Sequence, residues 1–502
     1  MTKAHPIETS PQGPAPRGPA VAPEAPGVPD GLAAPPQAPC RLRIRSGTPL
    51  RGRIGVPGDK SISHRAVLLG ALAEGTTRVR GFLAGADCRA TVQAVRALGV
   101  AVRAPGGDGP GPTREAVAEA VVEIEGVGKH GLREPAAVLD CQNSGTTMRL
   151  LAGLLAGQRF TSFLSGTPQL CRRPMARVVT PLREMGALIV GRQGGRLAPL
   201  GLHGALEQAL RGVTHRAPIA SAQVKSALLL AGLYADGPVV LHEAGPSRDH
   251  TERMLAAMLT APALERGEGV IRIDGRRAER LRPLELTVPG DASSAAFILA
   301  AAAVVPGSDV TVVGVGTNPT RTGFIDALRA MGADLTIEHP RVQAGEPVAD
   351  VRLRHRPLRG LALGGPDIVR LVDELPVLAV VATQAAGRTE VRDAAELRVK
   401  ETDRIAATVA TLAAFGAAAG ALDDGFVLEG PVALGGAALS SLGDHRIAMA
   451  ATVAALCAEG ESLIDRTEVT ADSFPGFAEA LCALGADVTA AGPLRRAAEA
   501  YE

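Results

Sequence analysis

An internal repeat limits what this chain of 502 residues can fold into. Six times, an Ala- and Leu-rich segment of helical length ends in small residues and glycine, and a β-branched strand follows. These segments are residues 61–74, 144–157, 221–232, 292–304, 374–386 and 445–459. A second amphipathic segment closes most units near a glycine, as at Gly186 and Gly485. Because the period is far longer than that of a solenoid, each unit is an α/β module, and we expect two domains of three modules.

Composition excludes several classes of protein. The formal net charge of +1 gives no overall field that would attract nucleic acid or an anionic membrane surface. The six cysteines form no close CxxC pair, so neither a zinc site nor a disulfide framework is predicted. No apolar run reaches transmembrane length, and the N-terminus lacks a secretory pattern. We therefore expect a cytoplasmic protein whose anion sites are built locally.

The two ends of the chain differ from the repeated part. Residues 1–40 are rich in Pro, Ala and Gly and contain few large apolar groups. Such a segment cannot bury enough surface to offset its ordering entropy, so a disordered tail is predicted. A Gly- and Pro-rich stretch at 105–116 is predicted to be a surface loop, and residues 488–502 to be a second tail.

The motif at 56–65, VPGDKSISHR, turns an extended segment into the first helix. Ser61 or Ser63 is the expected N-cap. A helix start with free N–H groups favours an anion, and Lys60 and Arg65 add positive charge there. The motif is therefore consistent with binding of a phosphorylated or carboxylated molecule, or equally with a capped helix and two solvated cations. It is not a P-loop, because Asp59 stands where glycine must precede the lysine.

Polar residues gather at the same places in the other units. At the helix starts they are 143–147, 221–223, Asp291, Asp373 and 444–446, and in the loops they are 172–173, 248–250, Arg321 and 400–404. In a pseudo-symmetric pair of domains these ends can face one interdomain cleft.

Each position also has a simpler interpretation. Capping is the commoner role for Asp291, Asp373 and Asp444. A surface ion-pair lattice is the commoner role for the Lys400–Arg404 run, and a structural role is commoner for histidines that lack metal-ligand spacing. The set as a whole favours an enzyme, because carboxylates among cations weaken anion binding but serve proton transfer.

The motifs resemble the 5-enolpyruvylshikimate-3-phosphate synthase family, in order, over about residues 48–487. They include PGDKSISHRA at 57–66, NSGTTMRLLAGLLAG at 143–157, SAQVKSALLLAGL at 221–233, SRDHTERML at 247–255, DELPVLAV at 373–380, AELRVKETDRI at 395–405 and GDHRIAMA at 443–450. The resemblance implies an α/β fold: a two-domain inside-out α/β barrel with six βαβαββ units, three per domain. Residues 60–288 would form one domain, and residues 41–59 plus 289–487 the other.

The resemblance also implies a reaction. The enolpyruvyl group of phosphoenolpyruvate would pass to the 5-hydroxyl of shikimate 3-phosphate, and phosphate would leave. The reaction needs a base, an acid that protonates C3, and neutralisation of two phosphates and two carboxylates. No metal or other cofactor is implied. The protein would act in chorismate and aromatic amino acid biosynthesis and would be a glyphosate target. We expect a monomer, and, because cations come from both halves of the chain, we expect the domains to close on the first substrate.

Site residues follow from the resemblance, motif by motif. The shikimate 3-phosphate pocket would contain Lys60, Ser61, Arg65, Ser221, Ala222, Gln223, Arg248, Asp373 and Lys400. The phosphoenolpyruvate pocket would contain Lys60, Gly145, Arg173, Gln223, Arg404 and Arg446, with Arg149 beside it. Asp373 would be the general base, Glu401 would deliver and remove the C3 proton, and Lys60 would bridge both substrates.

Some positions depart from the family pattern. Asp472 stands where many members have a lysine that often contacts phosphoenolpyruvate, and Gln169 lies in a run that differs from theirs. Ala222 and Arg248 resemble a branch of the family that includes enzymes less sensitive to glyphosate, whereas Gly145 keeps the small residue associated with inhibitor access. The two signals leave sensitivity undecided, and Gly145 motivates the hypothesis that the protein is sensitive.

Two alternatives stay open. A UDP-N-acetylglucosamine enolpyruvyl transferase would typically have Asn after Lys60 and a loop cysteine farther from Arg173 than Cys171. A non-catalytic phosphometabolite-binding protein would have little use for Asp373 and Glu401.

Overall fold

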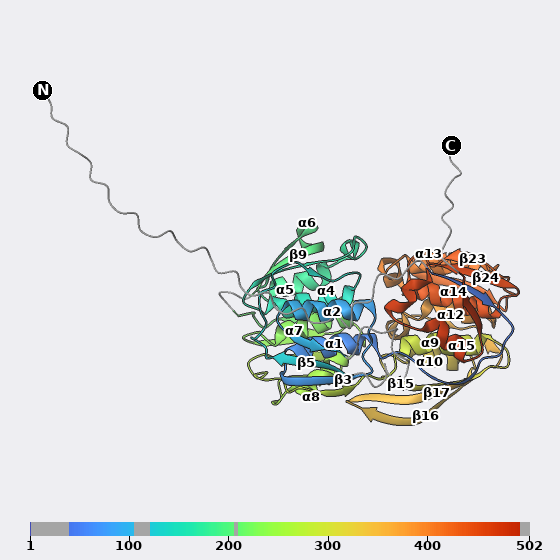
Figure 1. The fold of residues 1–502 in the computed structure, drawn as a ribbon, viewed down its shortest axis with the longest axis horizontal. Coiled ribbons are helices and arrows are strands. Elements are labelled where there is room, and N and C mark those ends of the chain that lie inside the picture. Colours follow the sequence, from blue (N-terminus) through green and yellow to red (C-terminus); the bar gives the residue numbers. More distant parts are fainter. Residues whose placement is uncertain (2–39, 105–120, 205–208, 492–502) are drawn as a thin grey trace.

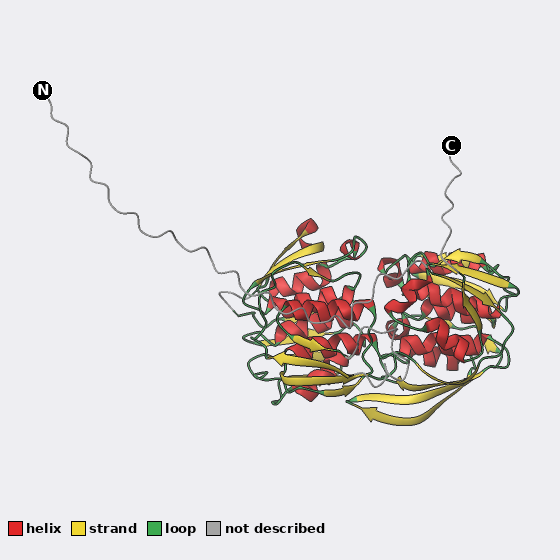
Figure 2. Cartoon of the chain, viewed as in Figure 1, coloured by secondary structure: helices red, strands yellow, loops and turns green. Residues whose placement is uncertain are grey.

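The computed structural model describes residues 1, 40–104, 121–204 and 209–491. The predicted tails and the loop at 105–116 therefore lie almost entirely outside the described residues. The described chain forms two lobes side by side, each with helices in the middle and strands on the outside (Figures 1 and 2). Among the described residues, no helix is both long and apolar enough to cross a membrane.

The six small sheets share one strand pattern, which matches the repeated-unit architecture. In each, a parallel pair at one edge is followed by two antiparallel pairings. The first lobe contains three of them: β14(Glu285–Thr287)-β3(Glu74–Arg80)-β5(Val121–Val127)-β4(Ala101–Arg103), β6(Leu139–Asp140)-β7(Thr161–Ser165)-β9(Leu197–His203)-β8(Leu188–Gly191) and β10(Thr214–Arg216)-β11(Pro238–His242)-β13(Val270–Asp274)-β12(Leu264–Gly267).

The second lobe repeats the pattern with strands from both ends of the chain. Its sheets are β16(Asp334–Gln343)-β17(Glu346–Arg354)-β15(Asp309–Gly316)-β2(Arg51–Gly55), β18(Leu358–Arg359)-β20(Ala385–Val391)-β22(Gly425–Gly430)-β21(Ala419–Leu422) with β19(Ala362–Leu363) beside β20, and β23(Ala438–Ser440)-β24(Glu461–Asp465)-β1(Arg41–Arg45)-β25(Asp487–Ala490). From residue 40 on, the chain thus lies first in this lobe, crosses to the other near residue 59 and returns near residue 289.

The helices carry the repeat as well. In the first lobe they are α1(Lys60–Ala71), α2(Ala86–Ala97), α4(Gly145–Ala156), α5(Ala176–Glu184), α6(Arg192–Gly195), α7(Ala222–Gly232) and α8(His250–Met258). In the second they are α9(Ala292–Val304), α10(Gly323–Ala330), α11(Pro366–Leu371), α12(Leu375–Thr383), α13(Arg404–Ala414), α14(His445–Cys457) and α15(Phe477–Ala483). Short 3₁₀ turns are η1(Leu170–Arg172), η2(Ala395–Val399) and η3(Thr467–Asp472).

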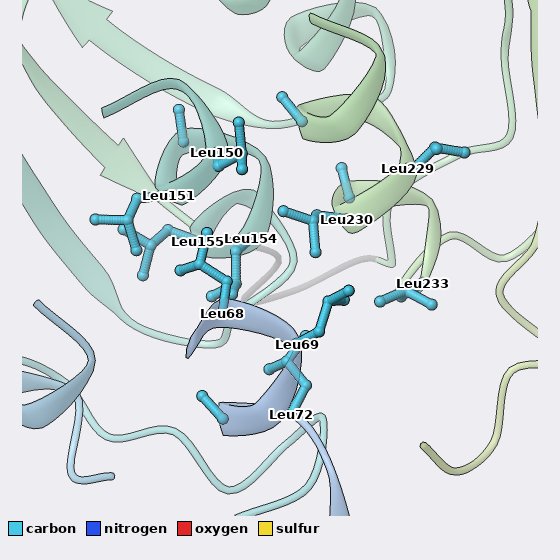
Figure 3. Packing of buried hydrophobic residues seen from close by; sticks show 14 of the residues in the cluster. Leu68, Leu69, Leu72, Leu150, Leu151, Leu154, Leu155, Leu229, Leu230 and Leu233 are labelled. Atoms are coloured by element: carbon cyan, nitrogen blue, oxygen red, sulfur yellow. The ribbon is translucent and has the colours of Figure 1, made fainter. Parts of the chain in front are cut away.

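Each lobe has its own hydrophobic core. One cluster of buried side chains comes from residues 62–288, and the other from residues 42–54 and 295–488. In the first core, leucines of α1, α4 and α7 pack together (Figure 3). Helices α4 and α7 lie so close that a Cβ at Gly153 would stand 2.1 Å from the carbonyl oxygen of Ala227, so only glycine fits there. The domain boundaries stay a prediction, which the two separate cores support.

Two local predictions were wrong. The cap of α1 is Asp59, whose carboxylate accepts from the N–H of Ile62 at 2.9 Å, and not Ser61 or Ser63. Asp373 caps no helix, because α12 begins two residues later and the Asp373 carboxylate is held by cations instead. By contrast, Asp291 and Asp444 cap α9 and α14 as expected.

Candidate active site

A cavity of about 260 Å³ lies between the two lobes. It is lined from the first lobe by the starts of α1, α4 and α7, and from the second by the starts of α9, α13 and α14 with the segments before α12 and α13. The polar helix starts of both lobes therefore converge, as the pseudo-symmetry predicted. Helix N-termini carry partial positive charge, so this arrangement favours an anionic ligand although the net charge of the chain is close to zero.

Lys60 is fixed at the first helix start by a carboxylate that the sequence did not identify. Its Nζ lies 2.5 Å from Oδ2 of Asp87, near the start of α2. Burial disfavours the charge of Lys60, but Asp87 outweighs it, and the pKa of Lys60 is raised above its ordinary value. Burial likewise opposes the charge of Asp87, but Lys60 lowers the pKa of that carboxyl. Lys60 is therefore a permanent cation at the cavity wall.

Asp373 is surrounded by four cations from both lobes. Its Oδ2 lies 2.6 Å from Nη2 of Arg248, and its Oδ1 lies 3.3 Å from Nζ of Lys400 and 3.4 Å from Nη1 of Arg404. Nη2 of Arg446 is 3.9 Å away. Burial alone would raise the pKa of Asp373, but the cations, Lys400 first, hold it well below its ordinary value. Asp373 is therefore ionised, and the surrounding cations weaken it as a base.

Glu401 forms a second carboxylate centre in the same cavity. Its Oε2 lies 2.7 Å from Nη2 of Arg404, and its Oε1 lies 3.2 Å from Nη2 of Arg173. Burial opposes ionisation of Glu401, but Arg404 and Arg173 hold its pKa well below the ordinary value. Nε of Arg173 is buried and makes no hydrogen bond, whereas Nη2 has its ion pair with Glu401. Nε lacks an acceptor, which an anion in the cavity would supply.

The start of α4 places a glycine among arginines. A Cβ at Gly145 would stand 2.7 Å from Nη1 of Arg149 and 3.4 Å from Nη1 of Arg173. Arg149 donates through Nη1 to Oε1 of Gln223 at 2.7 Å, and Gln223 donates to Thr146 at 3.0 Å. Burial and then the Arg173 charge lower the pKa of Arg149 to about 10. Because it has no side chain, Gly145 lets two guanidinium groups lie against the start of α4.

Three of the predicted or departing residues, Arg65, Gln169 and Asp472, lie outside the cavity lining. Arg65 is buried behind it and donates to Ser61 O, Ser226 Oγ and Thr251 Oγ1 at 2.6–2.8 Å. Asp472 ends η3; burial and then the Asp87 charge raise its pKa to about 6.

The remaining predicted residues line the cavity together. They are Lys60, Ser61, Gly145, Arg173, Ser221, Ala222, Gln223, Arg248, Asp373, Lys400, Glu401, Arg404 and Arg446. The sequence reasoning missed Asp87, and it expected Asp291, Arg321 and His445 near the cleft but gave them no role in the site. His445 stood in a quoted motif, and burial and then the Lys60 charge lower its pKa to about 3. His445 is therefore neutral.

Comparisons with known proteins agree with one another. Residues 44–481 match the family model of EPSP synthase (3-phosphoshikimate 1-carboxyvinyltransferase). A 3-phosphoshikimate 1-carboxyvinyltransferase of Desulforamulus reducens is 50% identical over 432 residues, which is 86% of this chain and 96% of the relative. One from Syntrophotalea carbinolica is 51% identical over 436 residues, 87% of this chain and 97% of the relative.

Solved structures give the same result. The EPSP synthase of Acinetobacter baumannii superimposes with a TM-score of 0.78 at 41% identity, over 90% of this chain and 100% of that one. The enolpyruvyl transferase NikO of Streptomyces tendae has a TM-score of 0.70 at 19% identity, over 91% of this chain and 100% of that one, and shares the fold.

Proposed function

The chain belongs to the EPSP synthase family and has 3-phosphoshikimate 1-carboxyvinyltransferase activity, a step of the shikimate pathway, and from this premise we propose how its residues carry out the reaction. The substrates implied by the family are shikimate 3-phosphate and phosphoenolpyruvate. The observation that carries the proposal is the placing of Asp373 and Glu401 about one cavity, each held by cations. A binding protein would gain affinity from the cations alone, whereas these carboxylates reduce it.

Shikimate 3-phosphate is proposed to lie against the starts of α1 and α7. Ser61, Ser221 and Gln223 offer polar groups there, with the backbone of Ala222, and Arg248 and Lys400 supply positive charge. In this structure, Arg248 and Lys400 neutralise Asp373. A bound phosphate and carboxylate would compete for those cations and leave Asp373 more basic. Substrate binding would thereby prepare the base.

Phosphoenolpyruvate is proposed to lie against the start of α4. Gly145 lets Arg149 and Arg173 lie against this helix start, and Arg404 and Arg446 line the same cavity, so the phosphate and carboxylate of this substrate would meet several guanidinium groups. Lys60 reaches the cavity between the two substrates. Nε of Arg173, a buried donor that makes no hydrogen bond, favours an anion at this place. Arg65, behind the wall, supports Ser61 through its backbone carbonyl.

The two carboxylates are proposed to divide the proton transfers. Asp373 takes the proton of the 5-hydroxyl while the hydroxyl oxygen attacks C2 of phosphoenolpyruvate. Glu401 becomes protonated once the anion binds Arg404 and Arg173, and it delivers this proton to C3. A tetrahedral intermediate results. Glu401 then removes a proton from C3, the C2–O bond to phosphate breaks, and the double bond re-forms. The proton that Asp373 accepted leaves with the phosphate, and the surrounding guanidinium groups stabilise that anion.

Release of phosphate from phosphoenolpyruvate tests the acceptor. We expect release with shikimate 3-phosphate and none with UDP-N-acetylglucosamine, because Ser61 and not Asn follows Lys60. Release with the nucleotide sugar would favour the sister transferase. Calorimetric binding of shikimate 3-phosphate without release would favour a binding protein.

A monomer in the cytoplasm is proposed as well. Both walls of the cavity come from one chain, so the site is complete without a partner subunit. The six cysteines are free thiols, in keeping with a reducing compartment. Light scattering during gel filtration gives the mass directly, and a dimer mass would contradict the proposal.

A further inference from the structure

Arg248 is carried by a short segment that is held firmly on both sides. On one side, Nζ of Lys225 donates to the carbonyl oxygen of Ser247 at 3.2 Å and pairs with Glu243 and Glu252 at 3.1 and 2.8 Å. All of these contacts lie within the first lobe. On the other side, α8 begins at His250, directly after Asp249. The position of Arg248 therefore depends on what fixes the start of α8.

The start of α8 is fixed by residues of the second lobe. Nδ1 of His250 lies 2.8 Å from Oε1 of Glu346. Asn318 donates to Oδ1 of Asp249 at 2.7 Å and to Oε2 of Glu346 at 2.9 Å. Exposed fractions are 6% for Asp249, 1% for His250, 2% for Asn318 and 3% for Glu346. The group is thus a buried polar cluster that joins the two lobes outside the cavity.

Glu346 reaches this cluster from the tip of a long hairpin. Strands β16 and β17 are joined by a two-residue turn at Ala344 and Gly345, both with positive φ, as a tight hairpin requires. Figure 1 shows this hairpin extending from the second lobe toward α8. Arg253 of α8 donates to the carbonyl oxygen of Gly345 at 2.8 Å. The hairpin tip is thereby docked on the first turn of α8.

The same residues could be taken for a metal site, because one ligand atom each of Asp249, His250 and Glu346 lies within 4.8 Å of the others. Their oxygens, however, already accept hydrogen bonds. Arg253 and Arg266 also donate to Asp249 at 2.9 and 2.6 Å. A divalent cation would have to displace two guanidinium groups, so the cluster is a hydrogen-bond network.

We propose that Glu346 is a positioning residue for shikimate 3-phosphate: through His250 and Asn318 it fixes the start of α8, and so aims Arg248 into the cavity. This rests on the proposed role of Arg248 in binding that substrate. Arg248 makes close contacts in the cavity, at 3.2 Å to Ser61 and 2.6 Å to Asp373. A shift of the helix start by about 1 Å breaks such contacts, and displacements of that size cost large factors in binding or rate.

The test is a double-mutant cycle between Glu346→Gln and Arg248→Ala. Glu346→Gln keeps the volume but replaces one carboxylate oxygen by a donor that faces either His250 or Asn318. We expect about a ten-fold rise in KM for shikimate 3-phosphate, about 1.4 kcal/mol. The KM for phosphoenolpyruvate and kcat should stay within two-fold. Glu338→Gln, on the same hairpin but away from α8, is the matched control and should behave as wild type.

The cycle separates this inference from the site assignment. If Glu346 acts through Arg248, Glu346→Gln adds nothing in the Arg248→Ala background. The same rise in both backgrounds, or no rise in either, overturns the positioning role. If Arg248→Ala itself leaves KM unchanged, the assignment of Arg248 to the substrate site is wrong instead.

Two further outcomes are decisive. Should Glu346→Gln not fold, His250→Asn in the same cycle tests the other end of the contact and must give the same pattern. A rise in melting temperature of the wild type with Zn²⁺, absent in Glu346→Gln, would make the cluster a metal site and overturn the proposal.

Discussion

Replacing Asp373 by Asn removes one charge and keeps the shape of the side chain. The amide of the Asp373→Asn variant would be a poor acceptor for the proton of the 5-hydroxyl, so the step that needs a base is lost. General base catalysis contributes roughly 10²- to 10⁴-fold, and we expect kcat to fall by about that factor. Arg248 and Lys400 neutralise Asp373 in the wild type, at 2.6 and 3.3 Å from its carboxylate. In the variant these two cations are free to bind the substrate.

Substrate affinity should therefore not fall with the rate. We expect the Kd for shikimate 3-phosphate to stay within about three-fold of wild type or to decrease, because one carboxylate no longer competes with the ligand for those cations. Calorimetry gives the Kd, and single-turnover phosphate release gives the rate. Asp350→Asn is the matched control, since Asp350 pairs with Arg53 at 2.9 Å outside the cavity and should leave both quantities unchanged.

Near wild-type turnover by Asp373→Asn would refute the base assignment. A loss of affinity as large as the loss of rate would refute the charge argument, because Asp373 would then hold the substrate and not only its proton. Both results are read from the folded protein, whose melting temperature is recorded alongside.

Three other perturbations test separate parts of the account. The Asp472→Asn variant should be more stable than wild type by about 1–3 kcal/mol at pH 8 but not at pH 4. The reason is that the folded-state pKa of Asp472 is about 6, so ionisation of this carboxyl costs stability as the pH rises through 4–6. Denaturant unfolding at both pH values measures the difference in unfolding free energy between variant and wild type, and the same difference at both would contradict the prediction. Gly145→Ala should raise KM for phosphoenolpyruvate several-fold and weaken glyphosate inhibition, since the added Cβ would stand 2.7 Å from Nη1 of Arg149. If KM and the inhibition constant at subsaturating phosphoenolpyruvate were unchanged, neither the substrate nor the inhibitor would bind beside Gly145. Arg177→Met removes a bidentate ion pair to Glu396, at 3.0 and 3.1 Å, that bridges the lobes at the cavity rim. The loss of about 0.2–1 kcal/mol should open the cleft slightly, so the radius of gyration should fall more than in wild type when shikimate 3-phosphate is added. Small-angle scattering curves identical to those of wild type would contradict this prediction.

The repeat and the helix starts could be predicted because each is written locally in the sequence. Small residues and glycines end the helices, and Asp291 and Asp444 cap them as their type suggests. The exchange of strands could not be predicted from local signals: β14 and β2 complete sheets whose other strands lie far away in the chain. Only the family resemblance indicated the two crossings between lobes.

The predictions for individual residues were wrong or missing where a side chain has a stronger partner in the folded protein than the start of its own helix. Asp373 has the type and place of a cap, but four cations in a buried cavity outweigh the N–H groups of α12. Asp87 was missed because it stands 27 residues after Lys60 on another helix, and only packing of α1 on α2 brings them to 2.5 Å. Charge pairs of this kind depend on tertiary structure and leave no sequence period.

The residues before Arg173 that differ from the family pattern make a contact that explains one of them, Gln169. Gln169 donates to the backbone carbonyl of Glu401, across the cleft, so the departure from the family pattern supplies a link to the segment that carries the second carboxylate. Pattern matching identified the position as unusual but could not indicate its partner.

Turnover in D₂O tests most directly whether Glu401 carries the C3 proton. During partial conversion, wild-type protein should place deuterium at C3 of the enolpyruvyl product, because the C3 group of the intermediate gains a deuteron and then loses either isotope. Glu401→Gln should give neither product nor deuterium in phosphoenolpyruvate, while Kd for shikimate 3-phosphate is kept. Deuterated product formed by Glu401→Gln at the wild-type rate would contradict the proposed division of proton transfers between Glu401 and Asp373.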